Sequence, residues 1–335
     1  MDRMYLSHDR VIHGFLLAHK RHPLHLERDW RKNRDHLGRK VSKEHAGPRI
    51  GIHPDHDIPQ ETRMNESALF LITFVIYIIA AFFYLVFLFS KKESAAKAGL
   101  SVVAVGFFVH TLALIWRTIE SGHAPFTNMY ESLSFLAWSG ALAYIVTEYK
   151  YKIRKAGPYL MLIIIGIMAL ASSPLMPKEA TPLVPALQSY WLWLHVSVTL
   201  LGEAFFAVAF VTSIMYLVAD SREKKGIAKE GAISSAKLDS ISYRCVAVGF
   251  PLFTLGGLVF GMVWAYKAWG SYWSWDPKET WSLITWFVFA LYLHTRIVMG
   301  WKGRRSALIT IIGFLAALFT YFGVNYLLAG LHSYT

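Results

Sequence analysis

The residues best suited to bind a ligand are tryptophans and histidines in the second half of the chain. Six of the twelve tryptophans lie between Trp264 and Trp286, and three of them alternate with a glycine, an Asp-Pro turn and a Lys-Glu pair in the segment WAYKAWGSYWSWDPKETW. Flat aromatic faces with backbone room and a few polar groups suit a large planar ligand with charged edges, a class that includes haem. The alternative is an aromatic belt, because Trp and Tyr favour the membrane–water interface.

This segment, residues 264–281, is the predicted ligand platform and is called the tryptophan loop below. Gly270 leaves room for the ligand to approach the backbone closely. Asp276 and Glu279 shape the loop or meet charges on a substrate. Carboxylates of the ligand would instead meet a cation such as Lys267, Lys278 or an arginine. The predicted ligand-binding residues are Trp269, Gly270, Trp273, Trp275, Asp276 and Glu279.

Two histidines have the same predicted depth as the tryptophan loop. His195 lies in WLWLHV at the outer end of one apolar segment, and His332 follows the outer end of the last one. Two neutral imidazoles that converge on one aromatic platform meet the requirement for bis-histidine ligation of haem iron. The alternative for each is an interfacial histidine that only makes hydrogen bonds.

Other ionisable residues lie inside apolar segments. His294 is roughly 18 Å below the outer start of its segment at about 1.5 Å per residue, which is past the middle of a bilayer. This depth favours a functional site, with a hydrogen bond to a neighbouring helix as the alternative. His110 and Glu203 have two interpretations: one is structural pairing or the lining of a cavity, and the other is contact with a ligand. His123 falls in the loop SGHAPFTNMYE, which argues against a haem pair on His110 and His123.

Long apolar segments must position these residues. The 335 residues are 55% hydrophobic and only 17% charged, which argues against a soluble enzyme. Each segment is long enough to cross a bilayer, so the sequence predicts an all-α polytopic integral membrane protein. The eight predicted spans are about 68–90, 99–117, 132–148, 158–173, 190–219, 241–264, 282–300 and 306–330.

Basic residues cluster in alternate connections between these spans. They follow the first, third, fifth and seventh spans, as in Lys91, Lys150, Lys224 and Lys302. By the positive-inside rule these connections are cytoplasmic, so the tryptophan loop and both ends of the eight-span region lie outside. The same clustering accounts for the net charge of +12, and no nucleic-acid partner is predicted.

The chain has a single cysteine. Cys245 alone excludes an intramolecular disulfide, a CxxC redox pair, a cysteine zinc site and a CxxCH haem attachment within the chain. Any redox or thioether chemistry must therefore use the thiols of a partner.

Residues 1–63 differ in composition from the rest. They hold nine of the fourteen histidines, thirteen Lys or Arg and nine Asp or Glu, without a sustained helical or strand period. We expect a disordered, basic, His-rich tail, in which the scattered histidines give little support for metal binding. The charge pattern of the spans places Met64 outside, so this basic tail would have to cross the membrane against the positive-inside preference. Either the tail crosses the membrane with the first span, or translation starts at Met64. We favour the start at Met64.

The tryptophan loop also matches a known motif. WGSYWSWDPKETW strongly resembles the WWD signature of the haem-handling proteins of cytochrome c biogenesis, and its ending is similar to the CcsA (ResC) type of System II. CcmC-like and CcmF-like sister groups share the opening WGxxWxWD and differ after it. The resemblance extends through HAPFTNMYESLSFLAW, WLWLHVSVTLLGEAFF, LYLHTR and GVNYLLAGLHSY, so it covers nearly all of 64–335, the predicted haem-handling domain, and none of 1–63.

The resemblance implies a role for three histidines. His195 and His332 match two external histidines that ligate haem iron from opposite faces above the membrane, while the tryptophan loop holds the macrocycle. His294 matches a membrane-embedded histidine of an earlier haem site, whose other histidine belongs to the partner CcsB (ResB). The tail 1–63 departs from the family, whose members begin close to the first span.

The resemblance further implies a haem-ligation subunit of the System II cytochrome c synthetase, active only with CcsB (ResB). Haem b would be presented on the outer, periplasmic side for thioether attachment to the CxxCH cysteines of an apocytochrome c, which thiol-reducing proteins keep reduced. The substrate's cysteines are the nucleophiles, so this chain has no catalytic nucleophile of its own. The expected location is the bacterial cytoplasmic membrane, or the thylakoid membrane in a plastid.

Two other functions stay open on the sequence alone. A haem exporter or chaperone would use the same histidines and platform without docking an apocytochrome. A b-type electron-transfer cytochrome would need paired histidines within the helices, whereas the strongest pair here, His195 and His332, lies outside.

Overall fold

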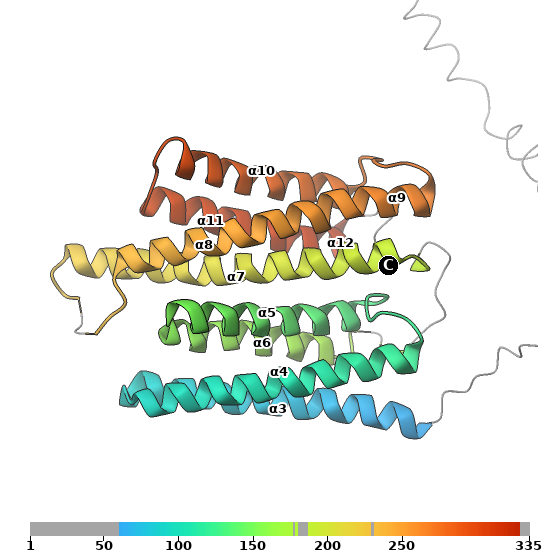
Figure 1. The fold of residues 1–335 in the computed structure, drawn as a ribbon, viewed down its shortest axis with the longest axis horizontal. Helices are drawn as coiled ribbons and strands as arrows, with labels where there is room; N and C mark the ends of the chain where they lie inside the picture. The colour runs from blue at the N-terminus through green and yellow to red at the C-terminus, as the bar shows by residue number, and fades with distance from the viewer. Residues whose placement is uncertain (1–59, 177, 180–186, 229–230, 329–335) are drawn as a thin grey trace, which may run out of the picture. The chain divides into compact units, whose positions relative to one another are not determined.

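The computed structural model describes residues 60–176, 178–179, 187–228 and 231–328, and every regular element in these ranges is helical (Figure 1). The predicted tail lies outside the described residues except for its last four positions, because the first helix begins at Gln60. His332 also lies outside the described residues. The predicted all-α membrane class is confirmed for the part of the chain that can be described.

The first pair of helices consists of α3 (Gln60–Ser90) and α4 (Glu93–Ser121), which pack side by side. Large apolar side chains such as Phe82 and Phe108 are more than 60% exposed on them. Exposed apolar side chains on helices of this length are suited to contact lipid. We therefore place this pair at the lipid-facing edge of the bundle.

The second pair, α5 (Met129–Tyr151) and α6 (Gly157–Ser172), is joined by the short helix η1 (Arg154–Ala156). α5 begins where the side chain of Asn128 accepts a hydrogen bond of 2.9 Å from the amide of Glu131, which satisfies a donor of the first turn. Fourteen of the 23 residues of α5 are buried. α5 is therefore an interior helix of the bundle.

The longest described helix, α7 (Tyr190–Lys224), packs along α8 (Ser235–Phe253). α8 continues without a break into the π-helical segment η3 (Thr254–Phe260) and into α9 (Gly261–Trp269), which leads to the tryptophan loop. This continuous helix carries the tryptophan loop to the end of the bundle where α7 begins (Figure 1).

The last elements are α10 (Pro277–Ile297), α11 (Arg304–Leu318), the π-helical η4 (Phe319–Gly323) and the short α12 (Val324–Leu327). The rings of Phe206 and Phe289 stack at 3.7 Å between centroids and join α7 to α10. The hydroxyls of Ser132 and Tyr321 lie 2.7 Å apart and join α5 to η4. These contacts tie the last helices to the middle of the bundle.

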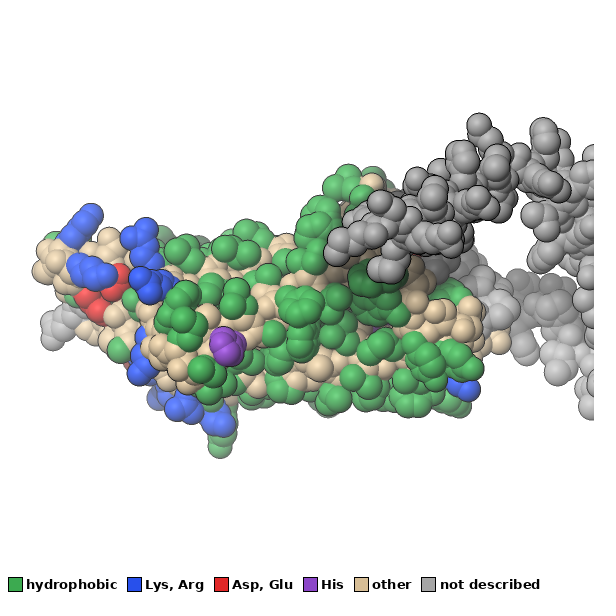
Figure 2. All heavy atoms as spheres, turned by 90° about the horizontal axis from the view of Figure 1, so that it is seen from above, with side chains coloured by type: hydrophobic (Ala, Val, Ile, Leu, Met, Phe, Trp, Pro, Cys, Tyr) green, Lys and Arg blue, Asp and Glu red, His purple; other side chains and the backbone are tan. Residues whose placement is uncertain are grey.

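The connections between helices separate by charge. The four basic connections, after α3, α5, α7 and α10, all lie at one end of the bundle, and the tryptophan loop and the α4–α5 connection lie at the other (Figure 1). Figure 2 shows Lys and Arg side chains gathered at the first end and hydrophobic side chains over most of the visible face. This arrangement agrees with the predicted alternation of the connections.

Six helical segments of the described residues are long and apolar enough to cross a membrane, so the predicted number of eight is not confirmed. The six are Glu66–Ser90, Glu93–Ser121, Arg154–Ser172, Tyr190–Lys224, Ser235–Trp269 and Arg304–Leu327. The other two predicted spans correspond to α5 and α10, which are 23 and 21 residues long. α5 is mostly buried among other helices, so its side chains need not be apolar to satisfy lipid.

Candidate functional site

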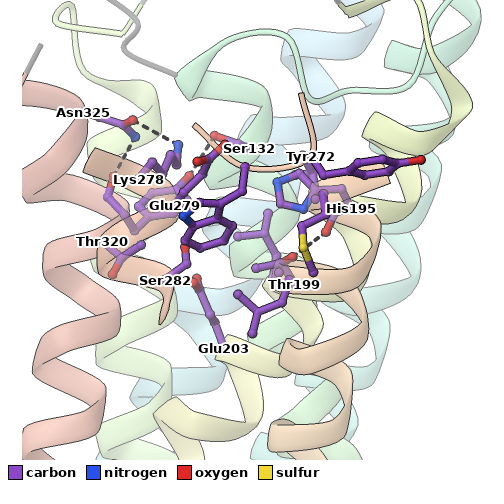
Figure 3. Close-up of a pocket in the computed structure, with 18 residues that line it drawn as sticks. Ser132, His195, Thr199, Glu203, Tyr272, Lys278, Glu279, Ser282, Thr320 and Asn325 are labelled. Atoms are coloured by element: carbon purple, nitrogen blue, oxygen red, sulfur yellow. Dashed lines mark hydrogen bonds between the residues drawn. The ribbon is translucent and has the colours of Figure 1, made fainter. Parts of the chain in front are cut away.

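His195 lies near the start of α7, at the end of the bundle that carries the tryptophan loop (Figure 3). Its Nδ1 is 2.8 Å from the carbonyl oxygen of Gly256 in η3. Because a carbonyl oxygen can only accept, Nδ1 carries the proton and the lone pair is on Nε2. A histidine held by a carbonyl in this way is typical of metal ligation.

A tryptophan supports the other side of this imidazole. The ring of Trp264, which is buried, lies parallel to the ring of His195, with the centroids 5.8 Å apart and the planes at 8°. The edge of Trp269 packs against Trp264 at 5.0 Å between centroids. The carbonyl of Gly256 and these two rings fix the orientation of His195.

Gly256 stands where η3 closely approaches α7. A Cβ atom there would be 2.7 Å from the carbonyl carbon of Val198 and closer still to the amide nitrogen of Thr199. Only glycine permits this approach of two backbones. η3 is also π-helical, a conformation that is rare and frequent at functional sites.

Helix caps shape the tryptophan loop. Gly270 ends α9 in the left-handed conformation, with φ of +79°. Asp276 begins α10 with a capping box, because its side chain accepts from the amide of Lys278 at 3.0 Å and the carboxylate of Glu279 accepts from the amide of Asp276 at 3.3 Å. Glu279 also accepts from the amide of Ser274 at 2.7 Å. The two acidic residues predicted for ligand binding therefore hold the loop in shape.

The three predicted platform tryptophans have different surroundings. Trp273 lines a cavity together with His195. Trp275 is 69% exposed and meets the edge of Trp273 at 5.7 Å between centroids. Trp269 instead packs behind His195, on Trp264. The structure thus brings Trp273 and His195 together and places the other two beside them.

A cavity of about 90 Å³ lies beneath the tryptophan loop (Figure 3). Lys278 is at its side and donates a hydrogen bond of 3.0 Å from Nζ to Oδ1 of Asn325 in α12. The polar residues around the cavity are Ser132, His195, Thr199, Glu203, Tyr272, Lys278, Glu279, Ser282, Thr320, Tyr321 and Asn325. The cavity is therefore formed by helices from across the chain, and several of them contribute polar side chains to it.

The other predicted iron ligands lie away from this cavity or cannot be placed. His294 is exposed near the opposite end of α10, roughly 24 Å from Lys278 at about 1.5 Å per residue. His332 lies outside the described residues. Of the three predicted iron ligands, the structure places only His195 at the cavity.

His110, His123 and Glu203, whose roles the sequence does not define, are buried. His110 lies between Ser134 Oγ at 3.0 Å and Tyr77 hydroxyl at 3.5 Å, so it has hydrogen-bond partners within the bundle. His123 is bonded through Nδ1 to the carbonyl of Ala124 at 3.0 Å. Both histidines therefore have hydrogen-bond partners within the described residues. Glu203 lines the cavity.

Sequence reasoning missed Trp264 and Gly256. Trp264 was counted within the cluster of tryptophans, but nothing in the sequence relates it to His195. Gly256 lies in a Gly-Gly pair inside an apolar segment, which is a general sign of close helix packing. Its contact with His195 depends on tertiary structure, because the two residues are 61 positions apart.

The donor set fits haem. A neutral imidazole with its Nδ1 held by a carbonyl can coordinate iron through Nε2, and Trp273 offers an aromatic face beside it. At about 90 Å³ the cavity is smaller than the roughly 300–1,000 Å³ of typical cofactor pockets, so it would not enclose a macrocycle. The site therefore suits a ligand held at the surface of the bundle.

Known proteins are similar to this chain in sequence. Residues 126–332 match the cytochrome c assembly protein family. Cytochrome c biogenesis protein CcsA of Guillardia theta is 40% identical over 284 residues, 78% of this chain and 94% of that protein, and CcsA of Gloeobacter violaceus is 36% identical over 311 residues, 77% and 92%. CcsA of Chlamydomonas reinhardtii is 43% identical over 238 residues, 70% of this chain and 67% of that protein.

The similarity to a solved structure concerns the fold alone. The cytochrome c haem lyase CcmF is 16% identical and superposes with a TM-score of 0.57 over 78% of this chain. The matched part spans 46% of the CcmF chain.

The fold and the site together define a polytopic helical membrane protein with a histidine and tryptophan site at one end of its bundle. The chain belongs to the cytochrome c assembly protein family, within which its relatives are CcsA proteins. The resemblance of the tryptophan loop is thereby confirmed.

Proposed function

We propose that this protein is the haem-handling subunit of a System II cytochrome c synthetase. It would hold haem b at the outer face of the membrane and present it to the CxxCH cysteines of an apocytochrome c, together with a CcsB (ResB) partner. The observation that carries the proposal is His195, whose Nδ1 is held by Gly256 at 2.8 Å next to the tryptophan loop. The names of the CcsA relatives and of the lyase CcmF support the same activity.

In this proposal the chain's own residues position the reactants. His195 and His332 would ligate iron from opposite faces, and Trp273 would contact the macrocycle. Haem supplies the two vinyl groups, to which the substrate's cysteine thiols add as S–H across each double bond. This chain binds and orients haem and leaves one edge open, so it needs no nucleophile.

His294 would serve an earlier haem site shared with the partner. It is exposed on α10 among exposed apolar side chains such as Phe287 and Leu291. An imidazole that faces hydrocarbon is costly unless another group pairs with it. A partner helix that brings a second histidine to this face would provide the pairing, and haem would pass from there to His195.

The experiment is expression of the protein with and without CcsB and a CxxCH acceptor, with haem per protein measured as the pyridine haemochrome. We expect His195→Ala to abolish covalent haem on the acceptor, and external imidazole to restore part of it, because a small ligand can enter the vacated position. Ser197→Ala, which removes a hydroxyl that donates to the carbonyl of Trp193, is the control. Normal maturation in both His195→Ala and His332→Ala would contradict the ligand assignment.

The same experiment separates the alternative functions. Haem that reaches the outer face without covalent attachment to the acceptor, even with CcsB present, would favour an exporter or chaperone. Attachment that depends on both proteins would support the synthetase. His294→Ala should lower the amount of haem bound at the outer site, and unchanged haem would argue against a relay through His294.

A further inference from the structure

Glu203 has an unusual position at the bottom of the cavity. It lies eight residues after His195 on α7, roughly 12 Å deeper at about 1.5 Å per residue. Its side chain lines the cavity, and the residue is 8% exposed (Figure 3). Among the residues that the structure describes, none makes a hydrogen bond to this carboxyl or an ion pair with it within 4.0 Å.

A buried carboxyl without a protein partner must obtain one from another source or stay protonated. The cavity of about 90 Å³ has room for several water molecules, since one water needs about 10–15 Å³ measured in this way. The hydroxyls of Thr199, Ser282 and Thr320 line the same space and can hydrogen-bond to them. Waters held by these hydroxyls would reach the carboxyl of Glu203.

The charged and titratable groups around Glu203 come from several elements. Lys278 in α10 is the cation whose charge acts on the Glu203 carboxyl. The other titratable side chains at the cavity are His195 of α7, Tyr272 of the tryptophan loop, Glu279 of α10 and Tyr321 of η4. Tyr272 is 54% exposed, so the cavity extends to the surface at the loop.

We propose that Glu203 and the waters of this cavity form a proton-binding site that exchanges protons with the outer solution. The carboxyl accepts the proton, and the hydroxyls hold the waters that deliver it. A lipid-facing carboxyl could not exchange in this way, because hydrocarbon offers no path for a proton.

This site has a consequence that rests on the proposed function. Reduction of haem iron above the cavity by an external one-electron donor adds one negative charge, and uptake of one proton by the Glu203 carboxylate cancels it. Because such coupling is reciprocal, the midpoint potential of the iron falls as the pH rises. The ferrous state is therefore easier to maintain while Glu203 is protonated than while it is ionised.

The first test uses the protein without haem in nanodiscs. Infrared spectra should show the carbonyl band of a protonated carboxylic acid that disappears as the pH rises, is absent from Glu203→Gln and shifts promptly in D₂O. Glu148→Gln should retain the band, because Glu148 lies at the basic end and pairs with Arg154 at 3.2 Å.

Two results of this test would overturn the proposal. One is a spectrum in which wild type and Glu203→Gln agree at every pH, and the other is a band that does not respond to D₂O. If Glu203→Gln does not fold, Glu203→Asp serves instead, because it keeps an acid and should move the band without removing it.

The second test measures the midpoint potential of bound haem against pH, with dithionite and mediators. One proton per electron gives a fall of up to about 59 mV per tenfold decrease in proton concentration in wild type, and no dependence in Glu203→Gln. Equal slopes would refute the coupling. Absence of bound haem would refute the proposed function and leave the infrared result to decide on the proton site.

Discussion

Gly256 and Gly257 are adjacent glycines with different surroundings, which makes them a matched pair. A Cβ at Gly256 would meet the backbone of α7, whereas one at Gly257 would have ordinary contact with the Phe253 ring at 3.5 Å. Gly256→Ala should push η3 away from α7 and weaken the hydrogen bond to His195. Loss of a group that orients a metal ligand costs about 10–100-fold in affinity, and we expect this loss in haem affinity, measured by titration.

Gly257→Ala should retain wild-type haem affinity and the low-spin signal of ferric haem in electron paramagnetic resonance. Both variants should be compared at equal amounts of folded protein, because overpacking at Gly256 costs stability as well. Equal haem affinities in the two variants would show that the carbonyl of Gly256 does not position His195.

Trp273 separates the two interpretations of the tryptophan loop. It lines the cavity beside His195, so Trp273→Ala removes an aromatic face worth roughly 0.5–1.5 kcal/mol of haem binding. Haem per protein should fall while the amount of protein in the membrane stays the same. Trp116→Ala, which removes a 36% exposed tryptophan from α4, is the control. A belt would give the opposite result, with less protein and unchanged haem per protein.

At the scale of the helices, Asp239 of α8 holds three segments together at the basic end. It accepts from both terminal nitrogens of Arg296 in α10, at 2.9 and 2.6 Å, and from the amide of Gly303 before α11, at 2.9 Å. Removing one partner of such a largely buried pair costs about 3–5 kcal/mol. Asp239→Ala should therefore lower the thermal midpoint of the protein in detergent markedly, as measured by circular dichroism.

An ion pair within α7 provides the control for this prediction. Asp220 pairs with Lys224, at 2.7 Å, and the lysine side chain is 71% exposed. A pair with so exposed a partner contributes about 0–1 kcal/mol, so breaking it by Lys224→Ala should leave the midpoint nearly unchanged. Similar midpoints for the two variants would mean that Asp239 does not connect the helices.

The helices also show where sequence reasoning reaches its limit. Apolar length predicts α3, α4 and α7 well, because lipid exposure demands apolar side chains along the whole helix. α5 departs from that rule because most of its residues face protein. The π-helical segments η3 and η4 line the cavity, and their hydrogen bonding has no pattern in the sequence.

At the scale of the whole molecule, the basic connections and the tryptophan loop lie at opposite ends of the bundle. This separation predicts how the protein is oriented in the membrane, with the tryptophan loop outside. The only cysteine, Cys245, is 2% exposed, so new cysteines can be labelled against a silent background. A membrane-impermeant maleimide should label Ser271→Cys in the loop from the outer side of intact cells. Ser221→Cys, at the basic end of α7, should react only after lysis. The reverse pattern would invert the proposed topology.

The sequence by itself determined the properties that depend on neighbouring residues. Apolar length and alternating basic connections define a helical membrane protein with two unlike ends, because lipid acts on each segment separately. The tryptophan loop was also visible in the sequence, because its glycine, Asp-Pro turn and Glu279 shape it over a few residues. The CcsA relatives confirm the family that this motif indicated.

Only the tertiary structure decided which of these residues meet. His195 and Gly256 are 61 positions apart, and Ser132 and Tyr321 are 189 positions apart, so their contacts depend on how whole helices pack. Packing also buried His110 with partners, exposed His294 and placed Glu203 at the cavity. A side chain's surroundings in a bundle are set by helices distant in the chain, and no local pattern records them.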